Sequence, residues 1–139
     1  MKNIHKKLFL PPFLLFLLCS CATTQSRMSA LSSTTGAVTS RVERLCIRNL
    51  VPATETNESI FLRATQDTPY ERADFEDYAF HAKCVSNHAV ILICSKDDTK
   101  ALIEDTSCVI GPDKRHYQTS PPVPCDFTIG ELYISEKCK

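Results

Sequence analysis

The sequence predicts a small α+β domain in which one amphipathic helix packs on an antiparallel sheet of about four to five strands. Three observations support this fold class. Apolar side chains recur at helical spacing between Phe75 and Val85, a run of six consecutive apolar residues follows at 89–94, and six cysteines are spread over residues 41–139. Because a domain of about a hundred residues has a modest core, we expect disulfides to contribute much of its stability.

The first twenty residues have the layout of an export signal. Three lysines and no acidic residue occupy positions 1–7, and residues 8–18 are apolar throughout. A cationic stub before about eleven apolar residues is typical of a signal peptide, and it is shorter than the roughly 20 residues that span a bilayer. The alternative, a buried N-terminal helix, would have to contain Pro11 and Pro12, which disfavour helix interiors. We therefore expect residues 1–20 to be a signal peptide.

The segment Leu18-Cys19-Ser20-Cys21 resembles a bacterial lipobox, with an aliphatic residue three positions before the modified cysteine and a small residue directly before it. The resemblance implies that Cys21 becomes the acylated first residue of an outer-membrane lipoprotein, sorted there by Ala22. Cys19 departs from the usual small or aliphatic residue at its position. Two or more acyl chains anchor a protein firmly. Ordinary cleavage after Ala22 is the alternative, and it would give a secreted protein without lipid.

Residues 21–40 are expected to form a lipidated, flexible tether. The segment is rich in serine and threonine, and Arg27 is its only charged residue. No helical or strand periodicity persists there, which is typical of a linker. A terminal strand over residues 31–38 is the alternative. The globular, cysteine-rich domain is then residues 41–139.

The first half of this domain predicts two strands and the helix. Partial alternation over residues 42–47 and 59–65 favours a strand in each segment. Thr68 and Pro69 then form a helix start, as N-cap and first helical residue. The apolar stripe of the helix that follows consists of Phe75, Tyr78, Ala79, Ala82 and Val85.

The second half predicts the rest of the sheet. Residues 89–94 form an unbroken apolar run that suits a strand buried on both faces. A polar turn at 96–100 leads to a broken returning strand over 101–110, and a second turn at 111–114 closes it. The prolines of 120–124 require an extended linker. A last strand over 127–134, kinked at Gly130, completes the sheet.

The six domain cysteines predict three disulfides, because an even set in an exported chain normally pairs. Fifteen connectivities are possible, and Cys125 with Cys138 is the most local candidate. The candidate residues are Cys46, Cys84, Cys94, Cys108, Cys125 and Cys138.

A metal site is the competing interpretation of the same region. His81, Cys84 and His88 lie within eight residues, and on a helix they would form a possible zinc or copper site with Cys94 not far on. No paired C-x₂-C accompanies them, so we expect no cofactor. A cationic cluster at 114–117 could touch a phosphate or carboxylate, although a solvated turn is its simpler interpretation.

The passage from Tyr78 through Asn87-His88-Ala89 to Cys94 resembles small outer-membrane lipoproteins of the RcsF type. The resemblance implies a lipid anchor, a tether and a small disulfide-stabilised domain, but no functional residue. That family has two disulfides in its domain, and the long proline-rich segment of this chain has no clear counterpart there. The resemblance covers architecture and compartment only.

We therefore expect a non-catalytic envelope lipoprotein, a membrane-tethered binding, sensor or assembly module. Its partners would be the lipid bilayer, through acylated Cys21, and an envelope protein or glycan, with the domain in the periplasm or at the cell surface. The zero formal net charge and pI near 6.9 argue against a nucleic-acid partner. The alternatives are a small exported metal-binding protein or enzyme using His81, His88 and His116, or a secreted cysteine-rich effector without lipid.

Overall fold

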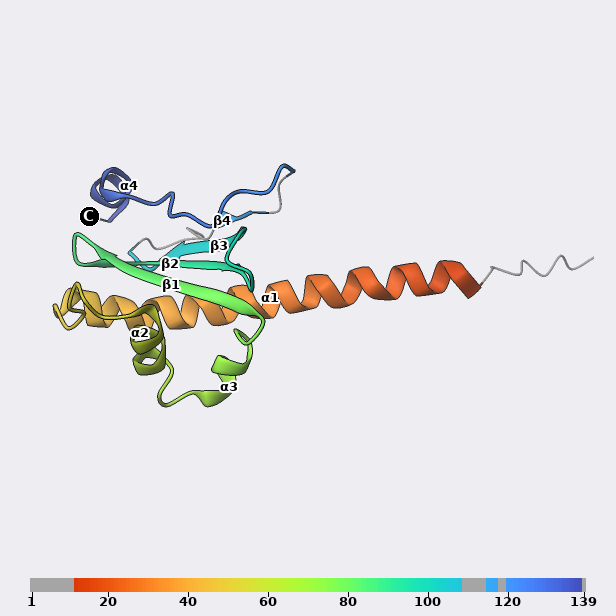
Figure 1. Ribbon diagram of the computed structural model, residues 1–139, viewed down its shortest axis with the longest axis horizontal. Helices are drawn as coiled ribbons and strands as arrows, with labels where there is room; N and C mark the ends of the chain where they lie inside the picture. Colours follow the sequence, from red (N-terminus) through yellow and green to blue (C-terminus); the bar gives the residue numbers. More distant parts are fainter. Residues whose placement is uncertain (1–11, 109–114, 118–119, 139) are drawn as a thin grey trace, which may run out of the picture.

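The computed structural model describes residues 12–108, 115–117 and 120–138. Its centre is a four-stranded antiparallel sheet in the order β1-β2-β3-β4, with one long helix along one face (Figure 1). This arrangement confirms the predicted α+β class. The helices are α1 (Pro12–Ile47), α2 (Asn57–Ala64), α3 (Pro69–Ala73) and α4 (Glu131–Lys137). The strands are β1 (Tyr78–Val85), β2 (His88–Ser95), β3 (Ala101–Thr106) and β4 (Arg115–His116).

Strand β2 is the centre of the core, as the apolar run at 89–94 predicted. Each of these six residues is almost fully buried. The side chains alternate: Ala89, Ile91 and Ile93 pack towards α1, whereas Val90, Leu92 and Cys94 pack towards the C-terminal segment. A strand covered on both faces needs no polar alternation, which explains the unbroken pattern.

Helix α1 replaces the flexible tether expected over residues 21–40, and the alternative strand at 31–38 is wrong as well. Leu31, Val38 and Val42 are buried against the sheet at helical spacing, together with two threonines, Thr35 and Thr39. Each threonine hydroxyl donates to the carbonyl four residues earlier, at 2.7 and 2.8 Å. Threonine can therefore lie on the buried stripe without an unpaired hydroxyl. The pattern of apolar residues does not reveal this helix, because two of its buried positions are occupied by threonine.

Helix α1 also contains residues 42–47, which were expected to form the first strand. The N-terminal part of α1 extends beyond the sheet (Figure 1). Of the expected signal peptide, residues 1–11 lie outside the described residues, and 12–20 have helical backbone. Among the described helices, none is both long enough and apolar enough to cross a bilayer.

In two further segments the secondary structure differs from the prediction: an expected strand is a helix, and most of an expected helix is a strand. Residues 59–65, expected as a strand, lie in and just after α2, where the Thr56 hydroxyl accepts a hydrogen bond from the Ser59 amide at 3.2 Å. The expected helix begins at Pro69 as predicted, but α3 ends at Ala73 and Tyr78 opens β1. Pairing with β2 over eight residues outweighs the helical spacing of the apolar stripe.

The C-terminal segment covers the other face of the sheet, opposite α1 (Figure 1). Its proline-rich part, predicted as an extended linker, bends at Ser120 and Pro121 and then lies against the start of β3, where Lys100 pairs with Pro124 and the Ala101 amide donates to the Val123 carbonyl at 3.0 Å. The last strand expected over 127–134 is wrong: Ile129 is buried in a segment without regular secondary structure, and α4 begins after its N-cap, Gly130. Strand β3 ends at Thr106, so the returning strand expected over 101–110 is shorter than predicted: Ser107 and Cys108 bend away from it. Residues 109–114, which include the expected closing turn, lie outside the described residues.

Candidate functional site

Three disulfides join the layers of the fold to the sheet. Cys46 at the end of α1 pairs with Cys84 of β1, Cys94 of β2 pairs with Cys125, and Cys108 after β3 pairs with Cys138 after α4. This confirms three disulfides among the six domain cysteines. The expected local pair of Cys125 with Cys138 is wrong, because residue 125 lies against β2 while residue 138 follows α4.

The structure does not bring His81, Cys84 and His88 together. Cys84 is bonded to Cys46, and the three residues lie in a β-hairpin instead of a helix. His81 is opposite Leu92, and His88 is opposite Val85, four positions further along β1. Since successive side chains of a strand alternate between faces, His81 and Cys84 also point to opposite sides of the sheet.

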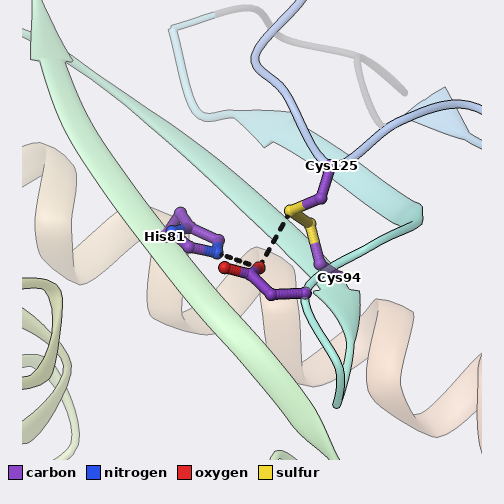
Figure 2. A group of neighbouring side chains, drawn as sticks. His81, Cys94 and Cys125 are labelled. Carbon is purple, nitrogen blue, oxygen red and sulfur yellow. Dashed lines mark hydrogen bonds and ion pairs between the residues drawn. A yellow bond between two sulfur atoms is a disulfide. The ribbon is translucent and has the colours of Figure 1, made fainter.

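His81 instead faces the Cys94–Cys125 disulfide (Figure 2). Its Nε2 lies 2.6 Å from Asp98 Oδ1, and that oxygen lies 3.1 Å from Cys125 Sγ. Asn57 fixes the histidine tautomer: its Oδ1 accepts from the Ala82 amide at 2.9 Å, so its NH₂ group faces His81 Nδ1 at 3.2 Å. Nδ1 is therefore the acceptor, and Nε2–H donates to Asp98.

This group contains four potential metal donors from His81, Cys94, Asp98 and Cys125, whose donor atoms all lie within 4.8 Å of one another. With both sulfurs in a disulfide, only the His81 ring and the Asp98 carboxylate remain as ordinary ligands. The protonated Nε2 would also have to lose its proton to bind an ion. The oxidised protein thus uses this group as a hydrogen-bonded support for the loop after β2.

Two further histidines of the described chain, His88 and His116, have separate partners. His88 Nδ1 lies 2.6 Å from Glu43 Oε1, and the second oxygen of Glu43 accepts from the Ala89 amide at 2.5 Å. His116 Nε2 lies 3.3 Å from Ser32 Oγ. These contacts attach α1 to β2 and β4. They place the three histidines with three different partners and do not build one site from them.

A buried carboxylate, Glu104, attaches the C-terminal segment to the sheet. The side chain is 0% exposed. It accepts from the Thr128 amide and the Ile129 amide, both at 2.8 Å, from the Thr128 hydroxyl at 2.5 Å and from the Tyr117 hydroxyl at 2.6 Å. Burial, reinforced by the hydrogen bond to Glu104, raises the pKa of Tyr117 above its ordinary value. Four donors satisfy a charge that would otherwise be costly to bury.

A groove of about 230 Å³ lies where the C-terminal end of α1 meets the segment from α2 to α3. Two of its arginines are held by carboxylates: Arg41 donates to both oxygens of Glu71, and Arg63 lies 2.8 Å from Glu55. These hydrogen bonds lower the pKa of both carboxyl groups. The groove is lined by Arg41, Arg44, Leu45, Arg48, Arg63, Ala64, Gln66, Asp67 and Thr68.

The remaining two arginines of the groove, Arg44 and Arg48, are exposed and have no carboxylate partner within the described parts of the chain. Arg44 donates only to the carbonyl of Ser40, at 3.2 Å. No sequence pattern predicted this groove. Its arginines come from positions 41–48 and 63, and no motif connects them. The cationic cluster that the sequence did suggest is described only at 115–117, where Arg115 donates to Thr128 and stacks over Tyr133.

In comparisons with known proteins, no family model, no curated protein and no solved structure matches the chain.

Proposed function

We propose that the protein is a lipid-anchored, non-catalytic module of the bacterial cell envelope. The observation that carries the proposal is the pairing of all six domain cysteines. Stable disulfides form in oxidising compartments such as the periplasm and the cell surface. Export to such a compartment requires a signal, and the N-terminal residues have the layout of one. The lipobox-like segment ending at Cys21 supports outer-membrane attachment.

The helical state of residues 22–40 changes how such an anchor would work. Helix α1 is continuous from Pro12 to Ile47, and Leu31 is the first fully buried residue among those from 25 onwards, whose side chains are described. At ~1.5 Å per residue, Cys21 lies roughly 15 Å along the helix from Leu31. A short helical spacer keeps the domain close to the membrane and limits its rotation, whereas a flexible tether would let it turn freely.

The role of the domain is to bind an envelope component. Support for binding over catalysis comes from the use of its interior carboxylates. Glu43 and Glu104 accept backbone amides, and Asp105 lies 2.8 Å from the Thr39 hydroxyl, whose one hydrogen it shares with the Thr35 carbonyl. Each of them fixes one covering layer to the sheet. The partner is an envelope protein or glycan, and the domain faces the periplasm or the cell surface.

Mass spectrometry of the mature protein without reductant tests the proposal. We expect a chain that begins at Cys21, carries the mass of the acyl groups and has no free domain thiol. Cys21→Ser should abolish lipidation and move the protein from the detergent phase to the aqueous phase. Cys19→Ser is the matched control and should remain lipidated. A mature N-terminus after Ala22 without acyl mass would contradict the anchor, and free thiols throughout the domain would contradict the compartment.

A further inference from the structure

The arginine-lined groove at the end of α1 contains more positive charge than its ion pairs neutralise. Glu71 and Glu55 pair with Arg41 and Arg63, but Arg44 and Arg48 have no carboxylate partner in the described chain. Asp67 is the only acidic residue among those lining the groove. Two guanidinium groups are thus available to an anion from solution.

The groove is also preorganised. Glu71 holds Arg41 through both of its terminal nitrogens, and the Thr68 hydroxyl accepts from the same guanidinium at 2.9 Å. Arg63 is fixed by Glu55 and by the Leu50 carbonyl, at 2.8 and 3.0 Å. Side chains held in this way lose little conformational entropy when a ligand arrives.

From these contacts we propose that the groove binds a phosphoryl group. Arginine recognises phosphate through paired N–H donors in a planar fork. The two negative charges of a phosphate dianion balance the two positive charges of Arg44 and Arg48, which have no carboxylate partner among the described residues. Gln66 lines the same groove and supplies a neutral amide donor.

The source of the phosphoryl group follows if the proposed lipid anchor is correct, and this step rests on that proposal. The helical path from Cys21 to Arg44 within α1 is roughly 35 Å at ~1.5 Å per residue. The groove is therefore at the end of the helix far from the anchor, beyond the Debye length of about 8 Å over which headgroup charge acts. We infer a soluble or polymeric phosphorylated envelope component as the ligand, and not the lipids of the anchoring leaflet.

Calorimetric titration of the full Cys21→Ser chain with inorganic phosphate tests the site without any contribution from the lipid. The parent chain should bind, more weakly as ionic strength rises. Arg44→Gln combined with Arg48→Gln should weaken binding about tenfold or more. Arg27→Gln is the matched control: Arg27 is exposed on the same helix and lines a different hollow, next to Asp74 and Asp77. It should bind as the parent does.

Several results would overturn the proposal. Phosphate heats equal to those of chloride, or binding by the double variant within about twofold of the parent, would remove the site. If the double variant does not fold, Arg48→Gln alone replaces it, because Arg48 is exposed beyond the end of α1. Arginine-dependent sedimentation with phosphatidylglycerol vesicles, combined with weaker phosphate binding, would overturn the inferred source. The titrated chain has no lipid, so a lack of phosphate binding would not contradict the proposed lipid anchor. Equally, a lack of lipidation would not contradict phosphate binding in the groove.

Discussion

Replacing Glu104 with alanine should strongly destabilise the attachment of the C-terminal segment. The substitution leaves the buried amide of Ile129 and the partly buried amide of Thr128 without an acceptor, and each orphaned donor costs about 1–3 kcal/mol. The hydroxyls of Tyr117 and Thr128 lose less, because they lie 2.8 Å apart and can bond each other. We therefore expect Glu104→Ala to lower the free energy of unfolding by about 4 kcal/mol.

Thermal unfolding followed by circular dichroism measures this loss. For a domain of this size, 1 kcal/mol corresponds to a Tm change of about 4–8 °C, so Tm should fall by roughly 15–30 °C. Glu104→Gln keeps one carbonyl acceptor and should lose less than half as much. Hydrogen exchange should accelerate at Thr128 and Ile129 before it does in β2.

Glu136→Ala is the control for this experiment, because Glu136 is an exposed carboxylate on α4. It should change stability by less than about 0.5 kcal/mol. The reasoning about Glu104 is refuted if Glu104→Ala destabilises by under 1 kcal/mol, or if it behaves as the control does.

Two other predictions concern the helical layer. Arg63 and Arg41 hold the pKa values of Glu55 and Glu71 below their ordinary value of 4.5, so these pairs stabilise the fold above that pH and lose their contribution as the pH falls below it. Urea unfolding across this range should show the loss, and Arg41→Gln should reduce it. Leu31→Ala should destabilise by about 2–5 kcal/mol and speed exchange in residues 25–38, whereas Leu132→Ala, at an 82% exposed position, should change little. Equal effects of the two leucine variants would contradict the docking of α1 on the sheet.

The sequence was most informative where one physical signal dominates. Six apolar residues in a row at 89–94 leave a doubly covered strand as the simplest solution, and β2 is that strand. It was least informative where polar side chains are buried. Thr35 and Thr39 lie at 0% exposure in the core, and their hydroxyls are satisfied by carbonyls of their own helix and, for Thr39, also by Asp105. A serine- and threonine-rich segment therefore has the composition of a linker and the structure of a core helix.

The helix predicted from the apolar stripe between Phe75 and Val85 was wrong for a different reason. Tyr78 and Ala82 are four residues apart, a spacing that places side chains on one face of a helix and also on one face of a strand. Pairing with β2 decides between helix and strand. The periodicity of residues within the segment contains no information about that pairing. The arginine groove was equally hidden, because it combines the end of α1 with residues at the end of α2 and just after it.

The Cys46–Cys84 cross-link has a mechanical consequence. If the chain is held at its N-terminus, tension runs along α1 and passes covalently from residue 46 to β1. The intervening segment, which contains α2 and α3, is bypassed. A ligand held by Arg44 and Arg48 would pull on the last turns of that same helix. A pulling force between the anchor and the ligand would then be transmitted through α1 alone, and the sheet would not be stretched.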